Sequence, residues 1–144
     1  MKKSFLLLPL GLACAMLTGC VTPFRAPADV ANIKLDRVHS PVVEVEKIWL
    51  ERKNGPLLLR GFVLKRLSAN DTSQTHLHVT LYDAAGRELR TSVEGFTPQK
   101  IPRPRTHRHR HGDATYQVVL DPLPAGTARI EVRAHEGADT ARGE

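Results

Sequence analysis

Apolar side chains recur at every second position through most of this chain, and that period limits what the chain can fold into. Residues 127–136 read TARIEVRAHE, in which Ala128, Ile130, Val132 and Ala134 alternate with charged residues. Side chains two positions apart share one face of a β-strand, whereas an amphipathic helix repeats every three or four positions. We therefore expect this segment to be a strand with one buried face.

Five further segments alternate in the same way or form short apolar runs between turn residues. They are residues 42–51, 57–66, 75–83, 87–96 and 114–121. The Asn54-Gly55 pair between the first two segments is a strong hairpin signal. Six closely spaced strands, with no convincing amphipathic helix among them, predict an all-β chain folded as a small antiparallel β-sandwich.

The alternation also predicts which side chains point into the core. The inward sets are Leu77, Val79 and Leu81; Leu89, Thr91 and Val93; and Tyr116, Val118 and Leu120. Trp49 is expected in the core as well, because large aromatic side chains commonly fill sandwich interiors. A Trp49 ring that stacks on a sugar is the alternative.

The middle of the chain resembles the bacterial FxLYD-type immunoglobulin-like domains. The resemblance covers about thirty residues, from LRGFVL to HLHVTLYDAAGREL. The matching positions are Gly61, Leu81, Tyr82, Asp83 and Gly86. This resemblance implies an immunoglobulin-like sandwich that serves as a binding or structural module, and it carries over no catalytic residue.

The N-terminus reads as a signal peptide. Lys2 and Lys3 precede an apolar run over residues 5–17, which is shorter than the roughly 20 residues that span a bilayer. The run ends in LTGC, which resembles the lipobox of bacterial lipoproteins. The resemblance implies that Cys20 receives a diacylglyceryl group, that the chain is cut before it, and that its new amine is acylated. Val21 stands where aspartate would favour inner-membrane retention, so we expect the periplasmic face of the outer membrane.

These signals divide the chain into four parts. Residues 1–19 are the expected signal peptide, 20–41 the lipidated cysteine and a proline-containing tether, 42–136 the sandwich, and 137–144 a disordered tail. Fully extended, such a tether would reach about 60 to 70 Å from the bilayer. Alternatively, part of it, with Ile33, Leu35 and Val38, docks as a short first strand.

The residue types that usually carry catalysis do not occur in their usual patterns. The sequence has no G-x-S-x-G elbow, no phosphate-binding glycine loop and no H-E-x-x-H motif. Cys14 would leave with the signal peptide and Cys20 would carry lipid, so the mature chain would have no free thiol. We expect a non-enzymatic protein.

Two histidine motifs make a metal site one hypothesis. His76 and His78 lie two apart on an expected strand, and THRHRHG places His107, His109 and His111 at the same spacing. If the two motifs meet, their imidazoles would supply three or four nitrogen ligands for Zn, Ni or Cu(II). The sequence establishes no cofactor.

The basic residues around that loop support a second hypothesis. The run without an acidic residue comprises Lys100, Arg103, Arg105, Arg108 and Arg110, in a chain of formal net charge +6. Guanidinium groups pair with phosphate and carboxylate, so anionic lipids or cell-wall polymers are candidate partners, and nucleic acid is not expected in this compartment. A merely solvated loop is the third alternative.

Together these features predict an outer-membrane lipoprotein that acts as a binding or accessory module of the cell envelope. Its expected partners are the membrane, through the N-terminal lipid, and an envelope protein or anionic polymer. The alternative function is that of an assembly factor resembling the small pilotin lipoproteins, which escort outer-membrane channels.

Overall fold

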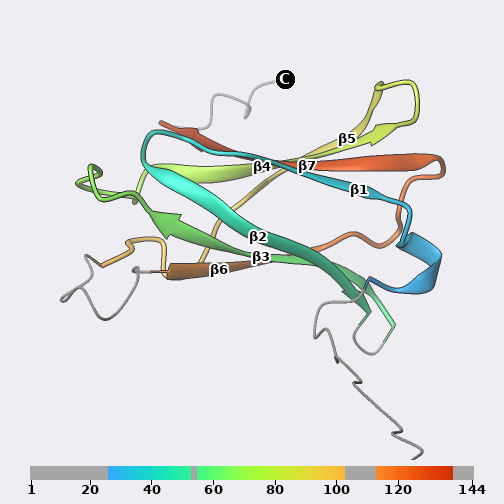
Figure 1. Ribbon diagram of the computed structural model, residues 1–144, viewed down its shortest axis with the longest axis horizontal. Helices are drawn as coiled ribbons and strands as arrows, with labels where there is room; N and C mark the ends of the chain where they lie inside the picture. The colour runs from blue at the N-terminus through green and yellow to red at the C-terminus, as the bar shows by residue number, and fades with distance from the viewer. Residues whose placement is uncertain (1–25, 53–54, 103–112, 138–144) are drawn as a thin grey trace, which may run out of the picture.

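Two β-sheets packed face to face make up the computed structural model, which describes residues 26–52, 55–102 and 113–137 (Figure 1). The elements are the 3₁₀ helix η1 (Ala28–Val30) and strands β1 (Lys34–Val38), β2 (Val43–Arg52), β3 (Leu57–Lys65), β4 (Thr75–Asp83), β5 (Glu88–Glu94), β6 (Asp113–Val119) and β7 (Thr127–Glu136). One sheet has the order β1-β7-β4-β5 and the other β2-β3-β6. The expected small β-sandwich is confirmed.

The first strand lies where the sequence predicted a tether. β1 pairs in parallel with β7, and it is the one parallel pair among the described strands. Ahead of it, Val30 is buried, and both Ile33 and Leu35 pack against the core. Part of the expected tether is therefore docked as a first strand, which was the alternative prediction. The folded domain begins before residue 42. Residues 138–144, most of the expected tail, lie outside the described part of the chain.

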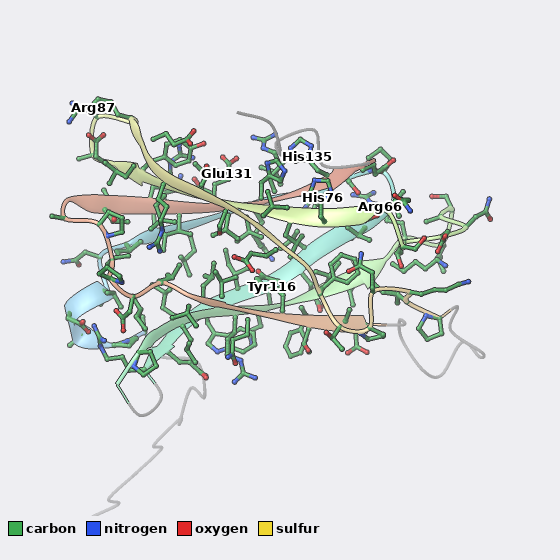
Figure 2. All side chains as sticks on the ribbon, turned by 180° about the vertical axis from the view of Figure 1, so that it is seen from behind. Arg66, His76, Arg87, Tyr116, Glu131 and His135 are labelled. Carbon is green, nitrogen blue, oxygen red and sulfur yellow. The ribbon has the colours of Figure 1, made fainter. Side chains whose placement is uncertain are left out.

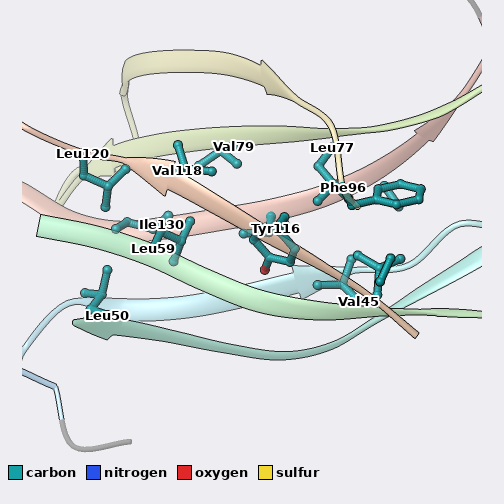
Figure 3. Packing of buried hydrophobic residues seen from close by; sticks show 14 of the residues in the cluster. Val45, Leu50, Leu59, Leu77, Val79, Phe96, Tyr116, Val118, Leu120 and Ile130 are labelled. Atoms are coloured by element: carbon teal, nitrogen blue, oxygen red, sulfur yellow. The ribbon is translucent and has the colours of Figure 1, made fainter. Parts of the chain in front are cut away.

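The inner faces of β4, β6 and β7 agree with the alternation in the sequence. Figure 2 shows Tyr116 between the sheets, and Figure 3 shows the aliphatic side chains that surround it. The buried residues on these faces and just beyond β6 are Leu77, Val79, Leu81, Tyr116, Val118, Leu120, Ile130, Val132 and Ala134. Each strand therefore contributes every second residue to one shared core.

The inward assignment of Leu89, Thr91 and Val93 on β5 is wrong. The register with β4 places Arg90 opposite Leu81, so Arg90 and every second residue from it are on the inner side of β5. β5 is an edge strand of the wider sheet, and the Arg90 guanidinium donates to the backbone carbonyls of Leu120 and Pro122 at 3.2 and 3.0 Å. A polar side chain suits the inner position because it bridges to the β6–β7 connection.

The core assignment of Trp49 is also wrong, because β2 contains a bulge. The β2–β3 register shifts between Val45 and Lys47, which adds one residue and reverses the alternation beyond it. Val45 and Leu50 are both buried, so Trp49 is on the outer face. There its ring lies 5.4 Å from that of Phe62, and its indole N–H donates to the Glu51 carboxylate at 3.3 Å.

Gly61 on β3 makes room for a large side chain. A Cβ atom at this position would overlap the Lys47 carbonyl oxygen and the Tyr116 ring. The Tyr116 hydroxyl is buried without a hydrogen-bond partner in the described part of the protein, and this burial raises its pKa above the usual value. The close approach of Tyr116 to the β3 backbone therefore depends on glycine.

We predict that Gly61→Ala destabilises the domain by at least about 2 kcal/mol, because the methyl group overlaps backbone that cannot move without disturbing β2. Gly95→Ala is the matched control, since its Cβ would meet only the Gln99 side-chain oxygen at an ordinary 3.5 Å. Urea denaturation measures both free energies of unfolding. Equal stability of the two variants would contradict the packing of Tyr116 over Gly61.

A second prediction uses the two faces of the four-stranded sheet. Ile130→Asp places a carboxylate at a position with no exposed surface, and it should cost several kcal/mol or prevent folding. Leu89→Asp makes the same kind of change at a side chain that is 37% exposed, and it should leave the melting temperature within a few degrees of wild type. A large loss from Leu89→Asp would show that β5 has the opposite face inward.

Candidate functional site

The outer face of the four-stranded sheet brings three histidines together. His76 and His78 alternate with the buried Leu77 and Val79 on β4, so both are on the outer face, and His135 lies on the neighbouring strand β7. Figure 2 labels His76 and His135. The antiparallel register places His135 directly opposite His76. We call these three residues the sheet histidines.

The three imidazole rings are in mutual contact. The Nε2 atoms of His76 and His78 are 3.1 Å apart. The centroid of the His135 ring lies 4.3 Å from that of His78 and 5.9 Å from that of His76, to which it is stacked with an angle of 12°. His76 and His78 are half-buried, and His135 is exposed. The two imidazole nitrogens are thus within hydrogen-bonding distance of one another.

Residues of β7 and β5 flank His78 in the sheet. Arg133 lies opposite His78 in the β4–β7 register, and its guanidinium pairs with Glu131 at 2.9 Å. On the other side of β4, Val93 of β5 lies opposite His78. The neighbouring cation is thus paired with a carboxylate, and the other flank is apolar.

A ladder of alternating charges continues along the same face. Lys34, Asp36, Arg129, Glu131 and Arg133 form successive ion pairs of 3.1, 3.4, 3.2 and 2.9 Å. The hydrogen bond from Lys34, with help from Arg129, lowers the pKa of the Asp36 carboxyl. Exposed pairs of this kind each add less than about 1 kcal/mol to stability. They link the charged side chains of β1 and β7 across this face.

The structure separates the candidates that the sequence identified. His76 and His78 are side by side, and Lys100 is exposed in the segment that follows β5. The remaining candidates lie outside the described residues: Cys20, His107, His109, His111, Arg103, Arg105, Arg108 and Arg110. A meeting of the two histidine motifs therefore stays a prediction.

Sequence reasoning did not include His135 in the site. Its alternation with Ile130, Val132 and Ala134 does predict an outward side chain, and this signal was present in the sequence. What the sequence lacked was the pairing of β7 with β4, and the register that sets His135 opposite His76.

No three metal-ligating side chains within residues 26–52, 55–102 and 113–137 already converge as an ion would need. The Nε2 atoms of His76 and His78 do approach one another, whereas the His135 ring stacks beside them instead of directing a nitrogen at the same point. The site as it stands is a pair of nitrogen donors with a third histidine in contact.

A separate hollow of about 400 Å³ lies where β3 ends, and it is lined by Glu44, Leu64, Lys65, Arg66, Leu67 and Ser68. The Lys65 amine is turned inward and donates to the carbonyls of Asn70 and Ile101 at 2.8 and 3.4 Å. These two hydrogen bonds tie the amine to the loop after β3 and to the segment after β5. Leu67, at 84% exposed, projects from the rim.

Comparisons with known proteins do not assign this chain to a family. No protein-family model, curated protein or solved structure matches the chain. In the part of the chain that the structure describes, no helix has the length and apolar character to cross a membrane.

Proposed function

We propose that this protein is a lipid-anchored module of the bacterial cell envelope, attached through Cys20 to the periplasmic face of the outer membrane, with a non-enzymatic binding or accessory role. The LTGC sequence behind a basic and apolar leader supports the anchor. The sandwich supports a binding role, since its outer sheet face holds fixed charges and the sheet histidines.

The observation that carries this proposal is the short chain between Cys20 and the first folded element. Only residues 21–27 separate Cys20 from η1, and they span at most about 25 Å. η1 is fixed to the domain, because Val30 is buried and Asp29 pairs with Arg52 at 2.5 Å. A lipid on Cys20 would therefore hold one end of the sandwich close to the bilayer, well within the 60 to 70 Å expected of a longer tether.

This short tether would orient the domain relative to the membrane. η1 lies at the end where β1 begins (Figure 1), and His76 and His135 lie toward the other end (Figure 2). β1 runs parallel to β7 with Lys34 opposite Arg129, and His135 is six residues beyond Arg129, about 20 Å along the strand. The anchored end would face the membrane, and the sheet histidines would be exposed to the periplasm.

We predict that Cys20→Ser abolishes lipid attachment, because serine has no thiol to accept the diacylglyceryl group. The protein should then persist as an uncleaved precursor or appear in the wrong fraction. Mass spectrometry of the N-terminus and separation of inner and outer membranes measure both effects. Cys14→Ser is the control and should mature normally, since this residue lies within the leader. Normal maturation of Cys20→Ser would overturn the anchor.

The direction of the domain gives another prediction. Ala28→Cys in η1 and Leu67→Cys beyond β3 each place a thiol at an exposed position, at opposite ends of the sandwich. With a fluorophore on the thiol, lipid-attached quenchers should dim the label at residue 28 strongly and the label at residue 67 little, because β3 adds about 30 Å. Equal quenching of the two labels would contradict the short tether.

A further inference from the structure

We propose that His76, His78 and His135 bind a divalent transition-metal ion of the kind that prefers imidazole, such as Zn(II) or Cu(II), on the outer face of the four-stranded sheet. The proposal deepens the binding role given above by naming a ligand class. It rests on the geometry of β4 and β7, which is independent of the lipid anchor.

The first step is the distance between the two β4 imidazoles. A tetrahedral zinc ion with bonds of about 2.0 to 2.1 Å holds two nitrogen ligands about 3.3 Å apart, and a square-planar ion holds adjacent ligands about 2.9 Å apart. The observed separation of the His76 and His78 Nε2 atoms is 3.1 Å. An ion can therefore bridge the two nitrogens with little movement of either ring.

The second step is the third ligand. Residues directly opposite one another in an antiparallel pair have Cβ atoms about 5 Å apart, and His135 holds this position relative to His76. Its ring already contacts both β4 imidazoles, and it is exposed and able to turn to another staggered rotamer. Rotation of His135 toward the other two rings would complete three nitrogen ligands with one position open, as in zinc sites with three protein ligands.

The third step is the rigidity of the strands that carry these residues. Backbone hydrogen bonds between β4 and β7 fix the three Cα positions before an ion arrives. Sites built on strands lose less conformational entropy on binding than sites on loops. Once His135 turns, the sheet histidines would form a complete ligand set without His107, His109 or His111.

The charges near the sheet histidines are compatible with a dication. Of the groups that face them, Arg133 on β7 is paired with Glu131, and β5 presents Val93. The Glu136 carboxylate, next to His135, accepts a hydrogen bond from the Val42 amide at 3.1 Å. Because the Arg133 guanidinium is paired with Glu131, it repels a metal ion less strongly. Neutral imidazoles are the form that coordinates a metal ion.

Calorimetric titration of the full chain in detergent micelles with Zn(II) or Cu(II) tests the site. We expect one ion per chain, bound more weakly as the pH falls because protons compete for the imidazoles. His76→Gln, His78→Gln and His135→Gln should each reduce affinity at least about tenfold. The triple variant with glutamine at 107, 109 and 111 is the control and should bind as the wild type does.

Nuclear magnetic resonance of the unaltered protein avoids any doubt about the folding of variants. Zn(II) should shift the imidazole signals of His76, His78 and His135. His39 is the internal control and should not move, because its Nδ1 accepts a hydrogen bond from the Val45 amide at 3.1 Å.

Two results would overturn the proposal. One is an unchanged affinity in His135→Gln, which would remove the third ligand. The other is loss of binding in the triple loop variant while the three sheet variants bind normally, which would assign the ion to the loop. Neither result would affect the lipid anchor, which the Cys20→Ser experiment tests separately.

Discussion

The bulge in β2 decides which side chains of the three-stranded sheet face the core, and the rest of the packing depends on it. The extra residue between Val45 and Lys47 lets Val45 and Leu50 both point inward, although they are five positions apart. Next to the bulge, Gly61 pairs with Ile48, and its bare backbone accepts the Tyr116 ring from β6. The extra residue in β2 and the absence of a side chain at Gly61 therefore let the three strands of this sheet pack together at the Tyr116 ring.

The sequence predicted the strands well because strand alternation is a local property. Each of β4, β6 and β7 runs without a shift through its buried residues, so Ile130, Val132 and Ala134 of TARIEVRAHE faced as expected, whereas Ala128 lies at a register shift and is only partly buried. The two errors have non-local causes. Trp49 follows a bulge that depends on pairing with β3, and Leu89 lies on an edge strand whose inner side meets a loop instead of an opposing sheet. Local alternation cannot reveal either circumstance.

The candidate site shows the same difference between what local alternation predicts and what depends on strand pairing. The H-x-H spacing of His76 and His78 sufficed to predict two imidazoles on one face. His135 is 57 positions beyond His78, and only the register of β4 with β7 brings it within contact. The sequence thus indicated two of the three histidines and their strand, whereas the third depended on which strands are neighbours.

The parallel pairing of β1 with β7 has a mechanical consequence. Tension between a bilayer and a partner held near the sheet histidines would enter β1 at its first residue and leave β7 near its last. In parallel strands loaded at opposite ends, the force runs along the strands and is shared by all the hydrogen bonds between them. The alternative geometry, with force at one shared end, would open these bonds one after another. If the domain is anchored through Cys20 as proposed, this geometry would therefore resist pulling between its two ends.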